Sequence, residues 1–190
     1  MTRDDVQVRP VTADGWSTLG QVFGARGEDP SSCWCQRFRE HDEPDNRSAL
    51  HREVIDSAVP VGLVAYADAA PVGWTRVVPR STLPGITGNR ALARLLDHDP
   101  EAWWVSCFVV RRDHRRTGVG TRLLEAAIDW ATRHDGSVLD GHPVDTDGRT
   151  GPASPSAVFT GTSEMFRRAG FTELGRTYPI RPVMRRVLRT

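Results

Sequence analysis

Apolar residues along this chain follow two spacings, and these spacings predict its strands and helices. Dense or alternating apolar runs predict strands over 6–11, 61–67, 72–78, 103–110 and 137–142, a closing strand that begins at Phe171, and one more over 178–188. Apolar residues three and four positions apart predict helices over 47–57, 121–134 and 162–169, a short one over 91–96, and an early one that carries Trp16, Leu19, Val22 and Phe23.

Turn and cap residues suggest where these elements begin and end. The segment Asp68-Ala69-Ala70-Pro71 separates two strands and predicts an antiparallel hairpin. Asp14 is placed to cap the first helix, and Gly170 to end the last one. Residues 143–156 are rich in Pro, Gly, Asp, Thr and Ser, which predicts an exposed irregular loop.

The composition is that of one globular domain over residues 1–190, with 38% hydrophobic and 26% charged residues. All 25 basic residues are arginine, so mechanisms that need a Schiff-base lysine or a P-loop lysine are excluded. The 24 acidic residues leave a net charge of +1, and we therefore expect no nucleic-acid partner.

The first residues, Met1 to Asp5, lack the apolar core of a signal peptide, and no apolar run is long enough to span a membrane. We therefore expect a cytoplasmic protein without a membrane partner. Three cysteines in a reducing compartment do not predict a disulfide framework. Cys33-Trp34-Cys35 has no second Cys or His pair at zinc spacing, so no metal site is expected.

The segment Arg115-Arg116-Thr117-Gly118-Val119-Gly120 joins the strand over 103–110 to the helix over 121–134. Its two glycines let the backbone approach a ligand, and the free amides of the helix's first turn favour an anion. Arginine side chains add positive charge at the same place. The sequence therefore predicts a phosphate-binding turn.

Three phosphate-binding motifs compete for this turn. A P-loop is excluded because Thr121 and Arg122 stand where its lysine would be. A dinucleotide motif needs a third glycine where Leu123 stands, although Asp140 lies at a suitable place for a ribose ligand. A dinucleotide oxidoreductase thus remains a distant alternative.

The third motif covers residues 109–124, which resemble the acetyl-CoA-binding motif of the GCN5-related N-acetyltransferases (GNAT): Arg or Gln, two residues, Gly, one residue, then Gly or Ala. Residues 165–171 resemble the last helix of that family and the strand after it, and Arg9 to Thr12 with Trp16 resemble its opening strand and helix. The resemblance implies an α/β (α+β) fold with a mixed, largely antiparallel central sheet flanked by helices.

The resemblance also implies a cofactor, acetyl-CoA, and its contacts. Its pyrophosphate would lie on the backbone of Arg115, Arg116, Thr117, Gly118, Val119, Gly120 and Thr121, and its pantetheine arm along main-chain groups of Phe108, Val109 and Val110. The acetyl group would pass directly to a primary amine in a ternary complex, with a backbone N–H of the strand stabilising the oxyanion. A small-molecule amine is the expected acceptor, and a protein amine stays open, as does a homodimer.

The acid and base of the family do not carry over to this chain. Phe166 stands where many members have a tyrosine, Phe159 where an asparagine is frequent, and Trp104 where some have a glutamate. Glu101 and His142 are the candidate catalytic residues, because each flanks a central strand. Trp34 and Phe38 are candidates for the wall of the acceptor pocket. The alternative function is a catalytically silent CoA-binding module of the same fold.

Overall fold

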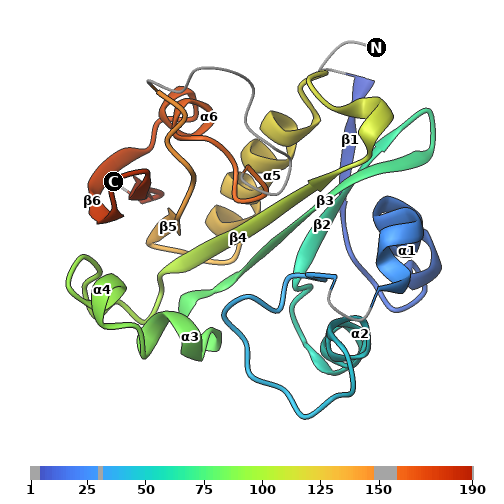
Figure 1. Cartoon of the computed structure of the whole chain (residues 1–190), viewed down its shortest axis with the longest axis horizontal. Coiled ribbons are helices and arrows are strands. Elements are labelled where there is room, and N and C mark those ends of the chain that lie inside the picture. Colours follow the sequence, from blue (N-terminus) through green and yellow to red (C-terminus); the bar gives the residue numbers. More distant parts are fainter. Residues whose placement is uncertain (1–4, 30–31, 148–157, 190) are drawn as a thin grey trace.

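The computed structural model describes residues 5–29, 32–147 and 158–189. Its centre is a seven-stranded sheet in the order β1-β2-β3-β4-β5-β7-β6 (Figure 1). Neighbouring strands are antiparallel except β4 and β5, which run parallel, so the sheet is mixed and largely antiparallel as expected. The strands are β1 (Gln7–Pro10), β2 (Gly62–Ala67), β3 (Ala70–Pro79), β4 (Trp103–Val110), β5 (Val138–Gly141), β6 (Thr172–Tyr178) and β7 (Arg181–Val187).

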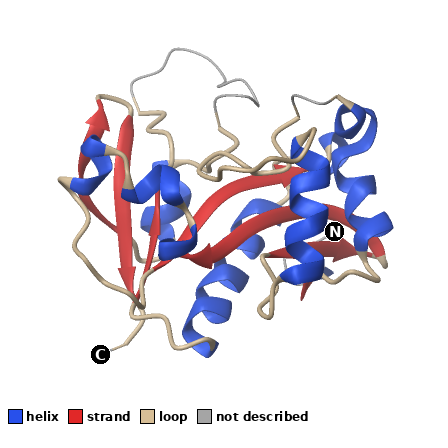
Figure 2. Cartoon of the chain, turned by 90° about the horizontal axis from the view of Figure 1, so that it is seen from below, coloured by secondary structure: helices blue, strands red, loops and turns tan. Residues whose placement is uncertain are grey.

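Helices lie on both sides of the strands (Figure 2). The α-helices are α1 (Trp16–Phe23), α2 (Asn46–Asp56), α3 (Pro84–Thr87), α4 (Arg90–Ala93), α5 (Val119–Arg133) and α6 (Ser163–Arg168), with 3-10 turns η2 (Gly24–Glu28), η3 (Arg80–Thr82) and η4 (Arg112–His114). Within the described residues no helix is both long and apolar enough to cross a membrane.

Each face of the sheet has its own buried core. On one face, α5 buries the predicted stripe Leu123, Leu124, Ala127, Ile128 and Ala131, and α6 adds Phe166 beside it. On the other face, α1, α2 and the segment after β3 pack with Trp34, Trp74 and Trp104. Because each large apolar side chain buried this way contributes about 1.5–3 kcal/mol, both helical layers hold the sheet in place.

Local details differ from the sequence predictions at three places. Asp14 does not cap α1, because the N-cap is Gly15, whose N–H donates to Thr12 Oγ1 at 3.2 Å. Two short helices, α3 and α4, replace the single one expected over 91–96. The predicted exposed loop starts inside the molecule: Val144 and Asp145 are buried, and residues 148–157 lie outside the described residues.

Candidate functional site

Strands β4 and β5 diverge in the middle of the sheet. They pair from Trp103 to Val105 and then separate, and at this point β4 carries a bulge at Ser106, which has no counterpart on β3. A bulge bends its strand and is frequent beside active sites. The outer half of β4 therefore has a main-chain edge that β5 does not cover, and we call the space beside this edge the splay.

A buried ionic cluster holds the base of the splay. The carboxylate of Asp140 on β5 is fully buried and accepts hydrogen bonds from Arg80 Nη1 at 2.5 Å and from Arg185 Nε at 2.7 Å. These partners come from η3 and β7, so the cluster ties these two segments to β5. Asp140 is thus unavailable as a ribose ligand, which removes the main support for the dinucleotide alternative.

The phosphate-binding turn follows the open edge of β4 after the short turn η4. Thr117 Oγ1 donates to the carbonyl of His114 at 2.7 Å, and Arg115 Nε donates to the carbonyl of Val110 at 3.1 Å. Gly118 is the N-cap of α5 with a left-handed φ of 90°, and no side chain caps the first amides of the helix. The free amides and the helix dipole therefore form an anion cradle that continues the edge of β4.

One amide of the open edge already has a partner. Phe108 N–H donates to the carbonyl of Phe159 at 2.6 Å, so the segment 158–161, which precedes α6, lies against β4 in the splay. Phe166 packs beneath this point, edge-to-face with Phe108 at 6.3 Å between ring centroids. Phe166 is fully buried and has no ionisable group. The side chains of Phe108 and Phe166 are thus core, while the main chain of Phe108 faces the splay.

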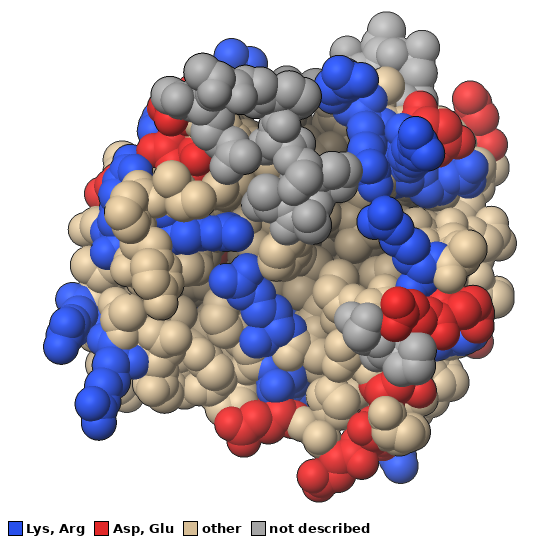
Figure 3. Space-filling view, viewed as in Figure 1, with Lys and Arg blue, Asp and Glu red and all other residues tan. Residues whose placement is uncertain are grey.

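Positive charge gathers on the other rim of the splay. The Arg37 guanidinium lies over the rings of Phe38 at 5.0 Å and Phe159 at 5.4 Å, and Arg181 Nη1 donates to Thr160 Oγ1 at 2.8 Å. Desolvation and the neighbouring Arg181 lower the pKa of Arg37, and desolvation lowers that of Arg181. Basic side chains also border the hollowed centre of the face shown in Figure 3.

His142 lies between these arginines and the end of β5. Burial, followed by Arg37 and Arg181, lowers its pKa to about 4, so the imidazole is neutral at pH 7. Its Nε2 is 2.8 Å from Thr177 Oγ1. Within the described residues, the buried atoms His142 Nδ1, Ser106 Oγ and Trp104 Nε1 have no hydrogen-bond partner. Buried polar atoms without partners are unusual, and these three belong to residues on β4 or directly after β5, while six others lie elsewhere in the described structure.

Three thiols meet beside the same strand. The Cys107 thiol on β4 hydrogen-bonds to those of Cys33 and Cys35, and burial raises its pKa. Hydrogen bonding to Cys107 lowers the pKa of Cys33 to about 7, so half-exposed Cys33 carries much thiolate at neutral pH. Trp34 and Cys35 have positive φ values of 21° and 43°, rare for residues other than glycine. Among the described side chains, no group of His, Cys, Asp and Glu is arranged to hold a metal ion.

The structure separates the remaining candidates from sequence. Glu101 precedes β4, with its exposed carboxylate 3.3 Å from Arg189 Nη1. Six residues of mostly extended chain, on the order of 20 Å, lie between it and Phe108. Trp34 is buried in the core, stacked on Phe23 at 4.0 Å. Phe38 is half-buried at the splay, edge-on to Trp104 at 5.8 Å. The geometry thus brings His142 and Phe38 together and leaves Glu101 and Trp34 elsewhere.

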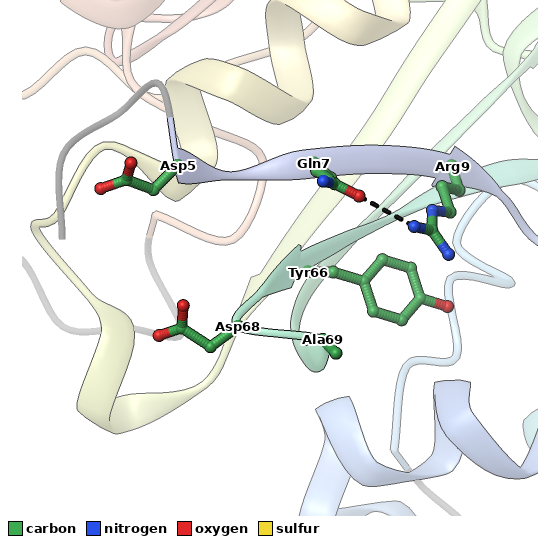
Figure 4. A pocket seen from close by; sticks show the side chains of 6 residues that line it. All are labelled: Asp5, Gln7, Arg9, Tyr66, Asp68 and Ala69. Atoms are coloured by element: carbon green, nitrogen blue, oxygen red, sulfur yellow. Dashed lines mark hydrogen bonds between the residues drawn. The ribbon is translucent and has the colours of Figure 1, made fainter.

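Two surface pockets lie outside the splay. A pocket of about 450 Å³ at the β1–β2 edge is lined by Asp5, Gln7, Arg9, Tyr66, Asp68 and Ala69 (Figure 4). Inside it, Arg9 donates to Gln7 at 2.8 Å and lies over the Tyr66 ring. The other, of about 360 Å³, lies beside α2 and is lined in part by Gln36, Arg39 and Glu53. Neither pocket contains a residue of the phosphate-binding turn.

Comparison with known proteins decides between the remaining families. The sequence model of the acetyltransferase (GNAT) family matches residues 28–143, more than half of the 190-residue chain. The chain belongs to the GNAT family. Among curated proteins no match was found. The family match thus agrees with the fold that the sequence motif predicted.

Solved structures agree with this GNAT fold over nearly the whole chain. A GCN5-related N-acetyltransferase from Kribbella flavida is 19% identical, with a TM-score of 0.58 and 98% of this chain and 100% of that chain covered. A putative acetyltransferase from Salmonella typhimurium, solved with its cofactor acetyl-CoA, is 16% identical, with a TM-score of 0.57 and coverage of 97% and 95%. A ribosomal-protein-alanine N-acetyltransferase from Brucella melitensis is 18% identical, with a TM-score of 0.57 and coverage of 96% and 99%.

Sequence reasoning missed the charged and thiol groups around the splay. Arg37 and Arg181 are far apart in the chain, and no local pattern relates them. Ser106 looks like an ordinary strand residue until the register shows its bulge. The one usable signal was Cys33-Trp34-Cys35, an unusual segment that the structure places against Cys107.

Proposed function

We propose that this chain transfers the acetyl group of acetyl-CoA to a primary amine, most simply that of a small molecule. Acetyl-CoA is the cofactor of the GNAT family. One observation carries the proposal: the edge of β4 that β5 does not cover leads, through the short turn η4, to the uncapped amides of α5. An extended arm with an anionic end fits such a surface, because main-chain groups pair with the arm and helix amides bind the phosphates.

The residues of the turn fit the pyrophosphate in detail. Arg116 and Gly118 have φ values of 63° and 90°, which orient successive amides around the start of α5. A Cβ added to Gly120 would meet only Met165 Sδ, at 3.7 Å, so the approach to the amides is open. Arg115 and Arg116 are exposed and supply charge to the same anion. Acetyl-CoA held there supplies an activated acetyl group as a thioester.

The chain's own groups then orient and deprotonate the acceptor. The Phe108 amide is the main-chain donor nearest the splay, and for a carbonyl oxygen to receive its hydrogen bond, the carbonyl of Phe159 must move away. His142 is the candidate proton acceptor at this position, although its lowered pKa makes it a weak base. The positive charge of Arg37 and Arg181 disfavours an ammonium ion nearby, so the acceptor enters more readily as the neutral, nucleophilic amine. Glu101 has no part in this arrangement.

Thiol release from acetyl-CoA, measured with a panel of primary amines, tests the proposed function. The panel contains diamines, amino sugars, amino acids and short peptides with free amino termini. We expect thiol release that depends on one class of amine, with the N-acetylated product identified by mass spectrometry. Binding of acetyl-CoA without transfer to any amine would instead favour a silent binding module.

A further inference from the structure

Arg37 and Arg181 approach one another at the splay without a carboxylate between them. Among the described residues, neither forms an ion pair with Asp or Glu, and residues 148–157 contain no acidic residue in the sequence. Elsewhere in this fold buried Arg80 and half-buried Arg185 both have acidic partners. The arginine pair at the splay therefore has no carboxylate partner among the described residues, and the groups that favour the charge of Arg37 are the nearby thiols of Cys35 and Cys107.

Holding two like charges together in a partly desolvated place is unfavourable. Desolvation and the charge of Arg181 lower the pKa of exposed Arg37, desolvation alone lowers the pKa of half-buried Arg181, and burial with both arginines lowers the pKa of His142. Two side chains keep the arginines in position: Phe38 lies under Arg37, and Thr160 accepts a hydrogen bond from Arg181. A bound anion would compensate the charge, and arginine is the residue best suited to bind planar or tetrahedral oxyanions.

Two buried polar atoms without partners on β4 also favour an oxyanion as the ligand. Trp104 Nε1 and Ser106 Oγ on β4 are two of the nine buried side-chain atoms that have no hydrogen-bond partner in the described structure. An indole N–H can only donate, and a hydroxyl can donate too, so oxygen atoms of a ligand would satisfy both. A ligand that carries an oxyanion thus matches both the charge and the hydrogen-bonding capacity of the site.

We propose that Arg37 and Arg181 bind an anionic group of the acceptor, a carboxylate or a phosphate monoester, while its amine lies at the splay. The acceptor class is then an amine that carries an oxyanion, such as an amino acid or an aminoalkyl phosphate. This inference rests on the proposed function, since it assigns the acceptor of the same site.

Matched acceptor pairs test the proposal. Each amino acid is compared with its amide, and each aminoalkyl phosphate with the corresponding amino alcohol, by kcat/KM for thiol release. We expect one anionic member to exceed its neutral counterpart by about tenfold to a hundredfold, the usual effect of hydrogen bonds to a charged group. The pair that shows the preference identifies the oxyanion.

Variants of Arg37 and Arg181 test whether these residues cause the preference for the anionic acceptor. In Arg37→Gln and Arg181→Gln we expect the ratio of kcat/KM for the anionic acceptor to that for its neutral counterpart to fall close to one, without a change in the affinity for acetyl-CoA. Arg181→Lys should retain part of the preference for the anionic acceptor. The matched control is Arg133→Gln, because Arg133 also lies over an aromatic ring, Trp130 at 5.8 Å, but at the far end of α5. Equal rates within every pair, or equal losses for both members of a pair, would refute the anion site and leave acetyl transfer standing.

A binding measurement that needs no turnover distinguishes a failure of the anion site from a failure of acetyl transfer. A carboxylate or phosphate analogue that lacks the amine is titrated into the wild type and Arg181→Gln by calorimetry. Binding that is lost in the variant supports the anion site even where no amine is acetylated. Binding that is absent or equal in both proteins overturns it.

Discussion

His142 is a residue whose chemistry depends on neighbours from distant parts of the chain. From the sequence alone it is a histidine at the end of a strand, with an ordinary pKa near 6.5. In the fold, burial and the two arginines lower that pKa to about 4. The sequence predicted that His142 ends the strand beside β4 but could not predict its protonation state.

The lowered pKa predicts how stability depends on pH. Between about pH 6.5 and pH 4 the unfolded chain binds a proton at this histidine and the native protein does not, so its contribution to stability falls as the pH falls. The slope is at most about 1.4 kcal/mol per pH unit. Urea unfolding of the wild type and His142→Gln at pH 7 and pH 5 measures it.

In that experiment the free energy of unfolding should fall less on acidification in His142→Gln than in the wild type. The variant His98→Gln, which removes an exposed histidine, serves as the control for loss of an imidazole. Parallel pH dependences in the wild type and His142→Gln would show that His142 is not held neutral in the native protein.

At the scale of elements, the sequence correctly predicted the features that depend on residues close together in the chain. The stripe of α5, the hairpin of β2 and β3, and the glycine turn depend on residues close in sequence, and the structure confirms all three. The prediction that Asp14 caps α1 was wrong, because Gly15 is the N-cap residue and its N–H donates to Thr12 Oγ1. The bulge at Ser106 could not be predicted from the sequence, because it depends on the register between β3 and β4.

The Asp140 cluster is the element-level feature that fixes the geometry of the splay. Asp140→Ala would leave Arg80 and Arg185 half-buried with only Asp97 and main-chain oxygens as partners. We expect a loss of about 3–5 kcal/mol in the free energy of unfolding, measured by urea denaturation. Asp147→Ala, which breaks only the exposed pair with Arg167, should cost less than about 1 kcal/mol. Similar small losses in both variants would mean that the cluster does not hold the splay.

At the scale of the whole molecule, the sheet order brings together what the sequence separates. Arg37 lies before α2, His142 follows β5, and Arg181 begins β7, yet they meet because β7 pairs with β5 and the loop over 32–39 packs on β4. The family motif indicates the proposed cofactor half of the site, whose residues are contiguous. The acceptor half that we propose comes from three distant segments, so neither its charge nor its thiols could be predicted from residue spacing.

The central claim is that the turn before α5 binds acetyl-CoA, and calorimetric titration of acetyl-CoA into Gly120→Trp tests it most directly. The indole would fill the approach to the free amides, whereas Thr132→Trp places the same bulk on an exposed position at the other end of α5. We predict saturable binding to the wild type and Thr132→Trp, and affinity weaker by about a hundredfold or more, the loss of several charge-assisted hydrogen bonds, in a folded Gly120→Trp. Unchanged affinity in Gly120→Trp, or a wild type that binds NAD(H) and not acetyl-CoA, would contradict the account.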